Sequence, residues 1–440
     1  MSAAPAAPPV HHASAHAAPL ASPPAEPFYY DVGQTVMVRG EGIYLFDQTG
    51  RRYLDCISGT FNLLLGHNHP AILAAVKEQM DRLVFAGSTF QSEPVSALAD
   101  ALIRICPPNL TRVHLRSPGG STANEGAIRI AQNVTGKRDV ITMFRGHLGQ
   151  TMATISMSGF AFHRAPFPYH YPGAVHVPDP YCYRCFYGQE PESCALPCVS
   201  RIADFIKYAS SGSVACLILE PIFGVGGNIT PPARYFQELK QLCEEQDIIL
   251  IFDEVQTGFG RTGHFFAADH FGVSPHMMTF AKGVTGSGFP LGGILTEPRL
   301  MGLPRVHHGF TYGGYPVAAA AALKTIEIIS EPSFLPSVRR VGAALKERLR
   351  ALMARFDFIG DVRGVGLMLG VEIIGPGKRA DPARTQDLAR RLFERGMIIR
   401  ISEHGRGNVF EVRPSLILTE EQAHEIADRF EEACDASRRA

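Results

Sequence analysis

Short apolar runs alternate with amphipathic stretches through the middle of the chain. The runs that predict strands buried on both faces cover 140–144, 214–219, 248–252 and 277–280. Between two of these runs, 235–245 is amphipathic, as expected of a helix that packs on a sheet. This alternation predicts an α/β fold with a mostly parallel sheet and helices on both of its faces.

The two ends of the chain have different patterns. Strand-like segments on either side of a turn at 48–50 predict a β-hairpin, and apolar positions spaced by four predict a helix over 70–83. After residue 317 the pattern is that of a smaller α+β domain. Its expected elements are helices over 318–329, 338–356, 386–396 and 420–434 and a strand over 366–373.

These patterns divide the chain into four expected parts. Residues 1–27 are nearly all Ala, Pro, Ser and His, without Lys or Arg, and predict a disordered tail. Residues 28–69 are expected to open the small domain and 317–440 to complete it. Residues 70–316 are expected to form the large domain, with a cysteine-rich loop at 181–199.

Composition narrows the class of protein. Basic and acidic residues balance at 42 each, which argues against a nucleic-acid or membrane-surface partner. No apolar stretch is long enough to predict a membrane span. The first residues lack the features of a secretory signal or transit peptide, so we expect a cytoplasmic protein with reduced thiols.

Two polar residues follow apolar strands and are candidates for chemistry. Ligands of parallel sheets bind beyond the carboxyl ends of strands, where Asp253 and Lys282 are expected. A carboxylate there suits a protonated ring nitrogen, and a lysine beside a buried cofactor can form an imine. The alternatives are a solvated acid and an ordinary lysine at a strand end.

A glycine-rich segment opens a predicted helix. Gly119 and Gly120 allow close approach of the backbone, and the free amides with the Ser121 hydroxyl can hold a phosphate. A capped helix is the other interpretation, with Ser121 or Thr122 as N-cap and Glu125 closing a capping box. The two interpretations are compatible.

These candidates lie within an ordered series of motifs. The series is Gly66-His67-Asn68-His69-Pro70, Gly120-Ser121-Thr122-Ala123-Asn124-Glu125, Glu220-Pro221, Asp253-Glu254-Val255-Gln256-Thr257-Gly258-Phe259-Gly260-Arg261, Ala281-Lys282-Gly283 and Thr311-Tyr312-Gly313-Gly314. Over residues 28–436 the chain resembles the class-III aminotransferases, which use pyridoxal 5'-phosphate (PLP). The resemblance implies fold type I, with a seven-stranded large domain and active sites at the interface of a homodimer or higher homo-oligomer.

The resemblance also assigns roles to single residues. Lys282 would form the Schiff base with the cofactor, the internal aldimine, and carry the proton to and from the substrate α-carbon. Asp253 would pair with the pyridine nitrogen. The remaining implied cofactor contacts are Val255 on one ring face, Gln256 at the phenolic oxygen, Gly120 and Ser121 at the phosphate, and Thr311 reaching that phosphate from the partner subunit.

Three positions depart from the family pattern. His147 stands where members usually carry the aromatic residue that stacks on the ring, so an imidazole is expected there. The Glu and Arg that form a switchable pair in many members are replaced by Val225 and Glu411, which argues against a typical acetylornithine, ornithine or 4-aminobutyrate enzyme. Arg413 is a candidate for binding a substrate carboxylate, and a structural salt bridge with Glu411 is the equal alternative.

The resemblance places the loop 58–62 at the substrate pocket. Thr60 stands where decarboxylating dialkylglycine relatives usually carry Gln, which argues against decarboxylation. Phe61 and Phe90 would suit an apolar substrate, although each is equally suited to the core.

Four of the nine cysteines cluster in the expected loop. Cys182, Cys185, Cys194 and Cys198 have a spacing that suits a tetrahedral structural zinc site remote from the amino-transfer chemistry. A disulfide pair or a loop of free thiols competes with that interpretation.

Three functions remain open at this point. The leading hypothesis is an aminotransferase that moves an amino group from an amino acid or amine to a 2-oxo acid or other carbonyl acceptor. A racemase or epimerase with the same cofactor is the second. A non-catalytic binding protein that kept the fold is the third, and the presence of Lys282, Asp253 and Gln256 argues against it.

Overall fold

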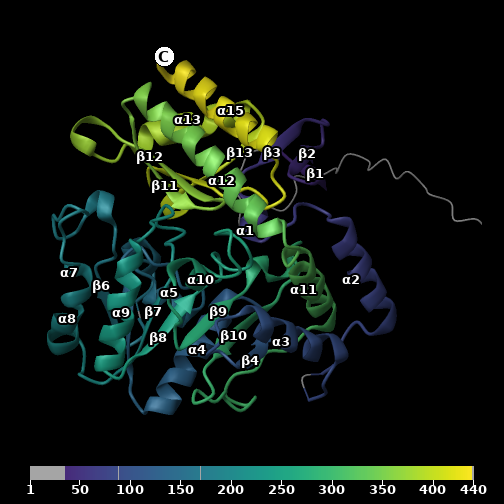
Figure 1. Ribbon diagram of the computed structural model, residues 1–440, viewed down its shortest axis with the longest axis vertical. Helices are drawn as coiled ribbons and strands as arrows, with labels where there is room; N and C mark the ends of the chain where they lie inside the picture. Colours follow the sequence, from purple (N-terminus) through teal and green to yellow (C-terminus); the bar gives the residue numbers. More distant parts are fainter. Residues whose placement is uncertain (1–34, 88, 169, 439–440) are drawn as a thin grey trace, which may run out of the picture.

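The computed structural model describes residues 35–87, 89–168 and 170–438, which form one large and two small sheets (Figure 1). The predicted tail, residues 1–27, lies outside the described residues. Within them, no helix combines the length and the apolar character needed to cross a membrane.

The large sheet has seven strands in the order β4-β10-β9-β8-β7-β5-β6. Strand β10 is antiparallel to both of its neighbours, and all other pairings in the sheet are parallel. The strand bounds are β4 Arg112–Ser117, β5 Asp139–Met143, β6 Ala174–Val177, β7 Val214–Leu219, β8 Ile249–Asp253, β9 Met277–Phe280 and β10 Gly292–Thr296. The expectation of a mostly parallel sheet is therefore confirmed.

Helices cover this sheet because their apolar sides need a partner. The helix α4 (Gly120–Thr135) packs across β7 to β10, and α9 (Ala233–Glu245) packs on β8. The helix α4 buries a row of Ala and Ile residues and ends at Gly136, which adopts the left-handed conformation that favours glycine. The other helices of this part are α2 Pro70–Arg82, α3 Glu93–Ile105, α5 Met152–Met157, α6 Ala161–Arg164, α7 Pro197–Ser200, α8 Ile202–Ala209, α10 Ala267–Phe271 and α11 Pro316–Ile329.

The predicted N-terminal hairpin forms and pairs with the C-terminal part of the chain. Strands β1 (Met37–Glu41), β2 (Tyr44–Asp47) and β3 (Arg52–Asp55) are antiparallel neighbours, and β3 is parallel to β13 (Met397–Ile398). The third sheet has the order β11-β12-β15-β14. Its strands are β11 Ile359–Val365, β12 Met368–Ile373, β14 Arg400–Ile401 and β15 Val409–Val412.

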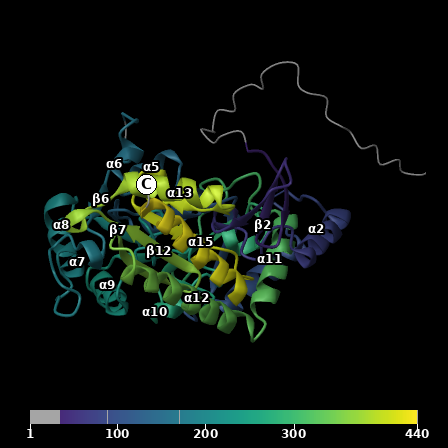
Figure 2. The same cartoon turned by 90° about the horizontal axis from the view of Figure 1, so that it is seen from above.

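Three long helices cover the smaller sheets. They are α12 (Phe334–Ala351), α13 (Pro382–Glu394) and α15 (Glu420–Arg438), and they lie above the large sheet in Figure 1 and cross the view in Figure 2. Their predicted counterparts differ only at the ends. The predicted strand 366–373 is shorter than expected, because a turn at 366–367 separates β11 from β12.

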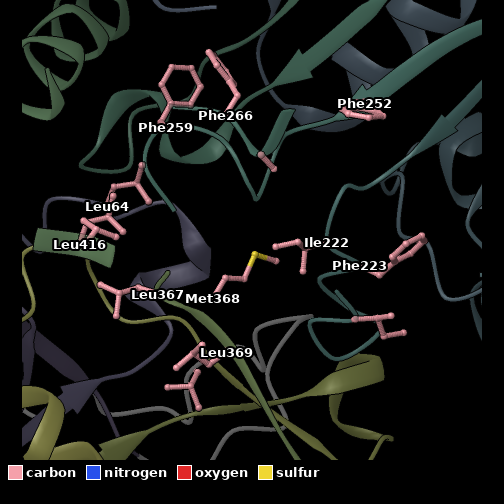
Figure 3. Close-up of a cluster of buried hydrophobic side chains, with 14 of the residues drawn as sticks. Leu64, Ile222, Phe223, Phe252, Phe259, Phe266, Leu367, Met368, Leu369 and Leu416 are labelled. Atoms are coloured by element: carbon pink, nitrogen blue, oxygen red, sulfur yellow. The ribbon is translucent and has the colours of Figure 1, made fainter. Parts of the chain in front are cut away.

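One hydrophobic cluster joins the two parts of the molecule. Figure 3 shows Phe259 and Phe266 at the top, Leu64 and Leu416 below them at the left, and Met368 near the centre of the view. All five side chains are at most 4% exposed. Burial of this many apolar side chains favours a fixed relation between the small sheets and the large sheet, and thus between the groups each contributes to the site.

Candidate active site

Asp253 and Lys282 lie at adjoining strand ends, as predicted. Strands β8 and β9 are parallel, and Asp253, the last residue of β8, pairs in register with Thr279 of β9. Lys282 follows β9 at the start of a short 3-10 helix, η2 (Lys282–Thr285), with φ of 43°. Carboxyl ends of parallel strands share one edge of the sheet, and the two side chains there are close enough for the charge of each to act on the other.

A buried hydrogen-bond network fixes the Asp253 carboxylate. Its Oδ2 accepts from Asn124 Nδ2 at 2.7 Å, and its Oδ1 accepts from the Val255 amide at 3.0 Å. Asn124 is held in turn by the Thr279 hydroxyl, which donates to its Oδ1 at 2.6 Å. Burial raises the pKa of Asp253, and these two donors and the charge of Lys282 oppose the rise. The carboxylate is thus oriented and ready for a cationic partner.

Lys282 is tuned toward its neutral form. Burial lowers the pKa of its amine, and the Asp253 and Glu220 carboxylates oppose that change. A lysine must lose its proton before its nitrogen can attack a carbonyl carbon, so the lowered pKa suits imine formation.

The start of α4 differs from the capped helix that the sequence offered as one interpretation. Its N-cap is Gly119, and no side chain caps it. Ser121 Oγ instead accepts from the Gln150 amide at 3.0 Å, and Glu125 accepts from the Thr151 hydroxyl. The predicted capping box is therefore wrong. The first amides of the helix have no partner within it, which leaves them for an anion.

The residues around this edge fit PLP. A Cβ on Gly120 would come 2.8 Å from Val255 Cγ1, so only glycine allows Val255 to lie against the start of the helix. The Gln256 Oε1 accepts from Arg413, which leaves the Nε2 donor for the phenolic oxygen of the cofactor. The site thus offers a carboxylate, an amine, an amide donor and a free helix start.

Of the two roles that the sequence left open for Arg413, the structure shows the salt bridge with Glu411. It is fully buried, donates to Gly224 O at 2.6 Å as well as to Gln256, and lies 3.3 Å from Glu411. Its guanidinium carbon lies 4.0 Å from the centroid of the Phe61 ring, so Phe61 supports it. The salt bridge with Glu411 is present, and Val225 and Glu411 are both buried where the family's switchable pair was expected.

His147 is fixed by Glu220, a residue to which the sequence pattern assigned no role. The His147 amide donates to Glu220 Oε1 at 2.8 Å, and Glu220 Oε2 accepts from Gly224 at 2.9 Å. Burial raises the pKa of Glu220 to about 8. Burial, with the charge of Lys282, lowers the pKa of His147 to about 2, so its imidazole is neutral. The Glu220-Pro221 motif drew attention to Glu220 in the sequence but gave no sign of its partner.

Two expected site residues lie on the surface of the protein. Thr60 is exposed and lies in the short helix α1 (Ser58–Phe61), directly before Phe61. Thr311 is also exposed and lines a surface hollow together with Phe85 and Gly309. A Thr311 that serves a site in another subunit needs such an exposed position.

The four clustered cysteines share one small cavity, and all of them are free thiols. Burial raises the pKa of Cys198 to about 12, and the neighbouring thiols add to the rise. Cys194 Sγ accepts from Arg234 Nη2 at 3.1 Å. The sulfur atoms do not converge as metal ligands do; in the described part of the chain, only His147, His163 and His404 bring three such atoms within 4.8 Å of one another.

Comparison with known proteins agrees with this geometry. The family model described as "Aminotransferase class-III" matches residues 29–434 of the chain. A leucine/methionine racemase from Thermococcus litoralis is 35% identical over 90% of each chain, and an acetylornithine aminotransferase from Methanothermobacter thermautotrophicus is 34% identical over 89% of this chain and 92% of its own. The crystal structure of a PLP-bound amine transaminase from an uncultivated Pseudomonas species has a TM-score of 0.87 at 29% identity, covering 94% of this chain and 98% of that one. The chain belongs to the class-III aminotransferase family.

Proposed function

We propose that the protein is a PLP-dependent aminotransferase that moves an amino group from an amino acid or amine to a 2-oxo acid or another carbonyl acceptor. The observation that carries this proposal is the placement of Asp253 and Lys282 at the ends of adjoining strands, with the Asp253 carboxylate fixed by Asn124. When bound, the protonated pyridine ring of the cofactor supplies an electron sink for the bonding pair at the substrate α-carbon.

The residues of the chain have separate tasks in this reaction. Asp253 keeps the ring nitrogen protonated, because its buried carboxylate is stabilised by a positive partner. Lys282 would hold the cofactor, and its Nζ would take the proton from the substrate α-carbon and return it. Its lowered pKa favours the neutral amine, which is the form that accepts a proton.

The other contacts hold the cofactor in place. Gly120 and Ser121 bind the phosphate at the start of α4, and Val255 packs on one ring face. Gln256 donates to the phenolic oxygen, in the orientation that Arg413 imposes. His147, neutral and fixed through Glu220, covers the other face.

A homodimer completes the phosphate site through Thr311 of the other subunit. Support comes from an apolar surface on the segments around this residue, where Phe90 is 76%, Val306 is 84% and Tyr312 is 59% exposed. Phe85 contacts Tyr312 with ring centroids 6.0 Å apart, so the two segments form one surface. Large exposed apolar patches mark interfaces between proteins.

A racemase is the second candidate. It is favoured by two relatives, the leucine/methionine racemase and an alanine/serine racemase from Pyrococcus horikoshii that is 34% identical over 90% of this chain. The two functions share the removal of the α-proton and differ in the fate of the substrate afterwards. A racemase returns the proton to the opposite face, whereas an aminotransferase releases a carbonyl product.

The cysteine loop is proposed to hold a structural zinc. The support is that the four thiols line one cavity, at a spacing that suits Cys₄ zinc. The sulfurs would have to approach one another on binding.

The test of function uses the purified protein saturated with PLP and a panel of single amino donors without an acceptor. An aminotransferase releases one carbonyl product per bound cofactor and then stops. A racemase releases none, while the donor loses its optical purity. If no donor gives either result, the catalytic proposal is wrong.

A further inference from the structure

Three histidines from distant segments meet beside the proposed cofactor site. His147 follows β5, His163 lies in α6, and His404 lies in the turn α14 (Ser402–Gly405) between β14 and β15. One ring nitrogen from each lies within 4.8 Å of the others. The ring centroids are 5.1 Å apart for His147 and His163, and 4.9 Å apart for His163 and His404. These three residues are here called the histidine cluster.

The histidine cluster has nitrogen atoms that the chain itself does not use. His163 is only 7% exposed, yet neither of its ring nitrogens has a hydrogen-bond partner within the chain. The buried Nδ1 of His147 has none either. Packing against Phe160 and Phe162 accounts for the burial of His163 but satisfies neither nitrogen. Buried polar atoms are nearly always bonded, so unpartnered nitrogens that lie together indicate a ligand that binds them jointly.

The three imidazoles are in the protonation state that binds metal ions. A metal ion takes the lone pair of a neutral imidazole. Burial lowers the pKa of His163 and of His404 to about 4, and that of His147 to about 2. At neutral pH each ring therefore has a lone pair and no proton to release before an ion binds.

The surroundings of the histidine cluster decide which class of ion fits. The charges of Arg164 and Arg406 act on His163, and those of Arg400 and Arg406 act on His404. Ca²⁺ and Mg²⁺ need oxygen ligands, which three imidazoles do not offer. Zn²⁺, Ni²⁺ and Cu²⁺ form strong bonds with imidazole nitrogen, and these bonds oppose the repulsion by the arginines. The same arginines favour an anion, such as hydroxide or chloride, as the fourth ligand.

The spacing of the histidine cluster is close to that of a three-histidine metal site. Zn–N bonds of about 2.1 Å in a tetrahedral site place the ligand nitrogens roughly 3.4 Å apart. The nitrogens of the cluster would therefore approach one another by at most about 1.4 Å. His404 can make this movement because its side chain is exposed, and its exposed side also gives an ion a route into the site. His147 is held more firmly, since its amide donates to Glu220 Oε1 at 2.8 Å.

Strained backbone presents His404 to the other two rings. Glu403 and His404 are consecutive non-glycine residues with φ of 55° and 53°. The Glu403 amide donates to Val225 O at 2.8 Å, which ties the strained turn to the segment after β7. Such strain persists where the surrounding structure enforces it, and it gathers at functional sites.

Arg400 competes with an ion for His404. Its Nη2 donates to His404 Nδ1 at 2.7 Å. A neutral imidazole has a single lone pair, so the bond to Arg400 leaves the proton on Nε2 and no nitrogen free for a metal. An ion must break this bond before His404 can bind it. Removal of Arg400 should therefore strengthen metal binding, which is the opposite of the effect of losing a ligand.

His147 links the histidine cluster to the reaction. Lys282 acts electrostatically on His147, which is the residue proposed to cover one face of the cofactor ring. We propose that the histidine cluster binds one transition-metal ion of the class of Zn²⁺ or Ni²⁺ and that the bound ion inhibits the enzyme. The ion inhibits because it holds the His147 ring toward His163 and His404 and adds positive charge beside Lys282. The inhibition rests on the proposed function, and the binding does not.

Metal binding is tested on the holoenzyme without substrate. Calorimetric titration of the desalted protein with Ni²⁺ should show a site that His163→Phe and His404→Asn each weaken by about 100-fold or more, because loss of a ligand costs more than loss of a group that orients one. Asn is chosen at position 404 because it tolerates a positive φ. His424→Gln, at an exposed histidine outside the cluster, is the matched control and should bind as the unaltered protein does.

Two further variants separate this site from other sources of binding. Arg400→Gln should bind Ni²⁺ about 10-fold more tightly, the range for loss of a charge-assisted hydrogen bond. Cys182→Ser should keep the site, because the cysteine loop is not part of it. Binding that is equal in His404→Asn and in the control would place the ion elsewhere, for example on the histidines of residues 1–27, and would overturn the proposal.

Inhibition is tested at buffered concentrations of free Ni²⁺, since amino acids also bind this ion. Ni²⁺ should stop amino transfer by the unaltered protein and by His424→Gln, and His404→Asn should need about 100-fold more Ni²⁺ for the same loss. The visible absorption of the bound cofactor should change with Ni²⁺ in the first two proteins and not in His404→Asn. This second measurement does not depend on turnover.

The outcomes distinguish the parts of the account. Absence of Ni²⁺ binding by the holoenzyme would overturn the proposal, and so would weaker binding by Arg400→Gln. Binding by the histidine cluster with full activity and unchanged cofactor absorption would overturn the inhibition. Failure of every amino donor, with Ni²⁺ binding that His404→Asn removes, would contradict the proposed function and support the metal site.

Discussion

The chemistry of this protein depends on a few side chains whose partners come from distant segments. Lys282 and Asp253 gain their properties from burial and from Asn124, Glu220 and Thr279, which the fold brings to the same edge of the sheet. At this scale we can predict the effect of changing the lysine alone.

Lys282→Arg should prevent attachment of the cofactor. Arginine keeps a positive charge and similar length, but it does not give up a proton in proteins and cannot form the imine. Borohydride reduction followed by peptide mass spectrometry should place the cofactor on Lys282 in the unaltered protein and on no residue of the variant. Amino transfer should fall by about 10²-fold or more.

The control for this experiment is Lys324→Arg, at a surface lysine paired with Glu327. It should retain labelling at Lys282 and full activity. Equal labelling of the Lys282→Arg protein at another lysine would show that the residue was misassigned.

The sequence predicts a site residue only where the role of that residue follows from its neighbours along the chain. Asp253 and Lys282 end apolar runs, so their place at a crevice follows from local pattern. The bond from His147 to Glu220 joins residues 73 positions apart, and no local pattern encodes it. The prediction of a capping box was wrong for the same reason. Ser121 and Glu125 form hydrogen bonds with Gln150 and Thr151, which lie in a loop that only the fold brings close.

Elements were predicted best where burial is complete. Strands β7, β8 and β9 are buried throughout, and their apolar runs are recognisable. Strand β4 mixes Arg and His with apolar residues, and β10 opens with two glycines, so neither was predicted. Tertiary pairing stabilises both strands in spite of their weak local propensity.

The cysteine loop gives a prediction at the scale of elements. Protein purified from cells grown with zinc should contain one zinc equivalent. The four cysteines that line one cavity can close around the ion as thiolates. Cys182→Ser and Cys194→Ser should each lose that zinc and lower Tm, with amino transfer retained in the folded protein. Metal analysis and thermal melts provide the measurement.

Cys106→Ser is the matched control, since Cys106 is half-buried and donates to Leu110 O, outside the loop. It should keep its zinc. Protein that contains no zinc, with all four loop thiols reactive toward a thiol reagent, would show that the loop is metal-free.

At the scale of the whole molecule, the apolar surface around Val306 predicts self-association. Val306→Glu places a charge on a side chain that is 84% exposed, so the folded protomer should tolerate it. A dimer interface would have to bury that charge, and sedimentation velocity should show a shift toward monomer. The monomeric variant should also retain its cofactor less well, because Thr311 of the other subunit would no longer complete the phosphate site. An unchanged sedimentation coefficient would show that any dimer interface lies on another surface.

Stability should fall in acid because several histidines that lose contact with solvent in the folded protein have a lowered pKa. Burial lowers the pKa of His114, His163, His176, His276 and His404 to about 4. In the unfolded chain these groups titrate near pH 6.5, so between about pH 6.5 and 4 the unfolded state binds more protons than the folded state. The free energy of unfolding therefore decreases as pH falls through this window.

Calorimetric melts from pH 7 to 4.5 measure this effect. Tm should drop steadily, and His163→Phe, which removes one of these groups, should make the drop shallower. A Tm that stays level or rises toward pH 4.5 would contradict the burial of these imidazoles.

The most direct test of amino transfer tracks the amino nitrogen itself. The holoenzyme is given a ¹⁵N-labelled amino donor and an unlabelled 2-oxo acid, and both amino acids are recovered and weighed by mass spectrometry. We predict that ¹⁵N is found in the amino acid formed from the acceptor, at a rate that Lys282→Arg abolishes. Label that stays entirely on a donor of declining optical purity would contradict amino transfer and identify a racemase.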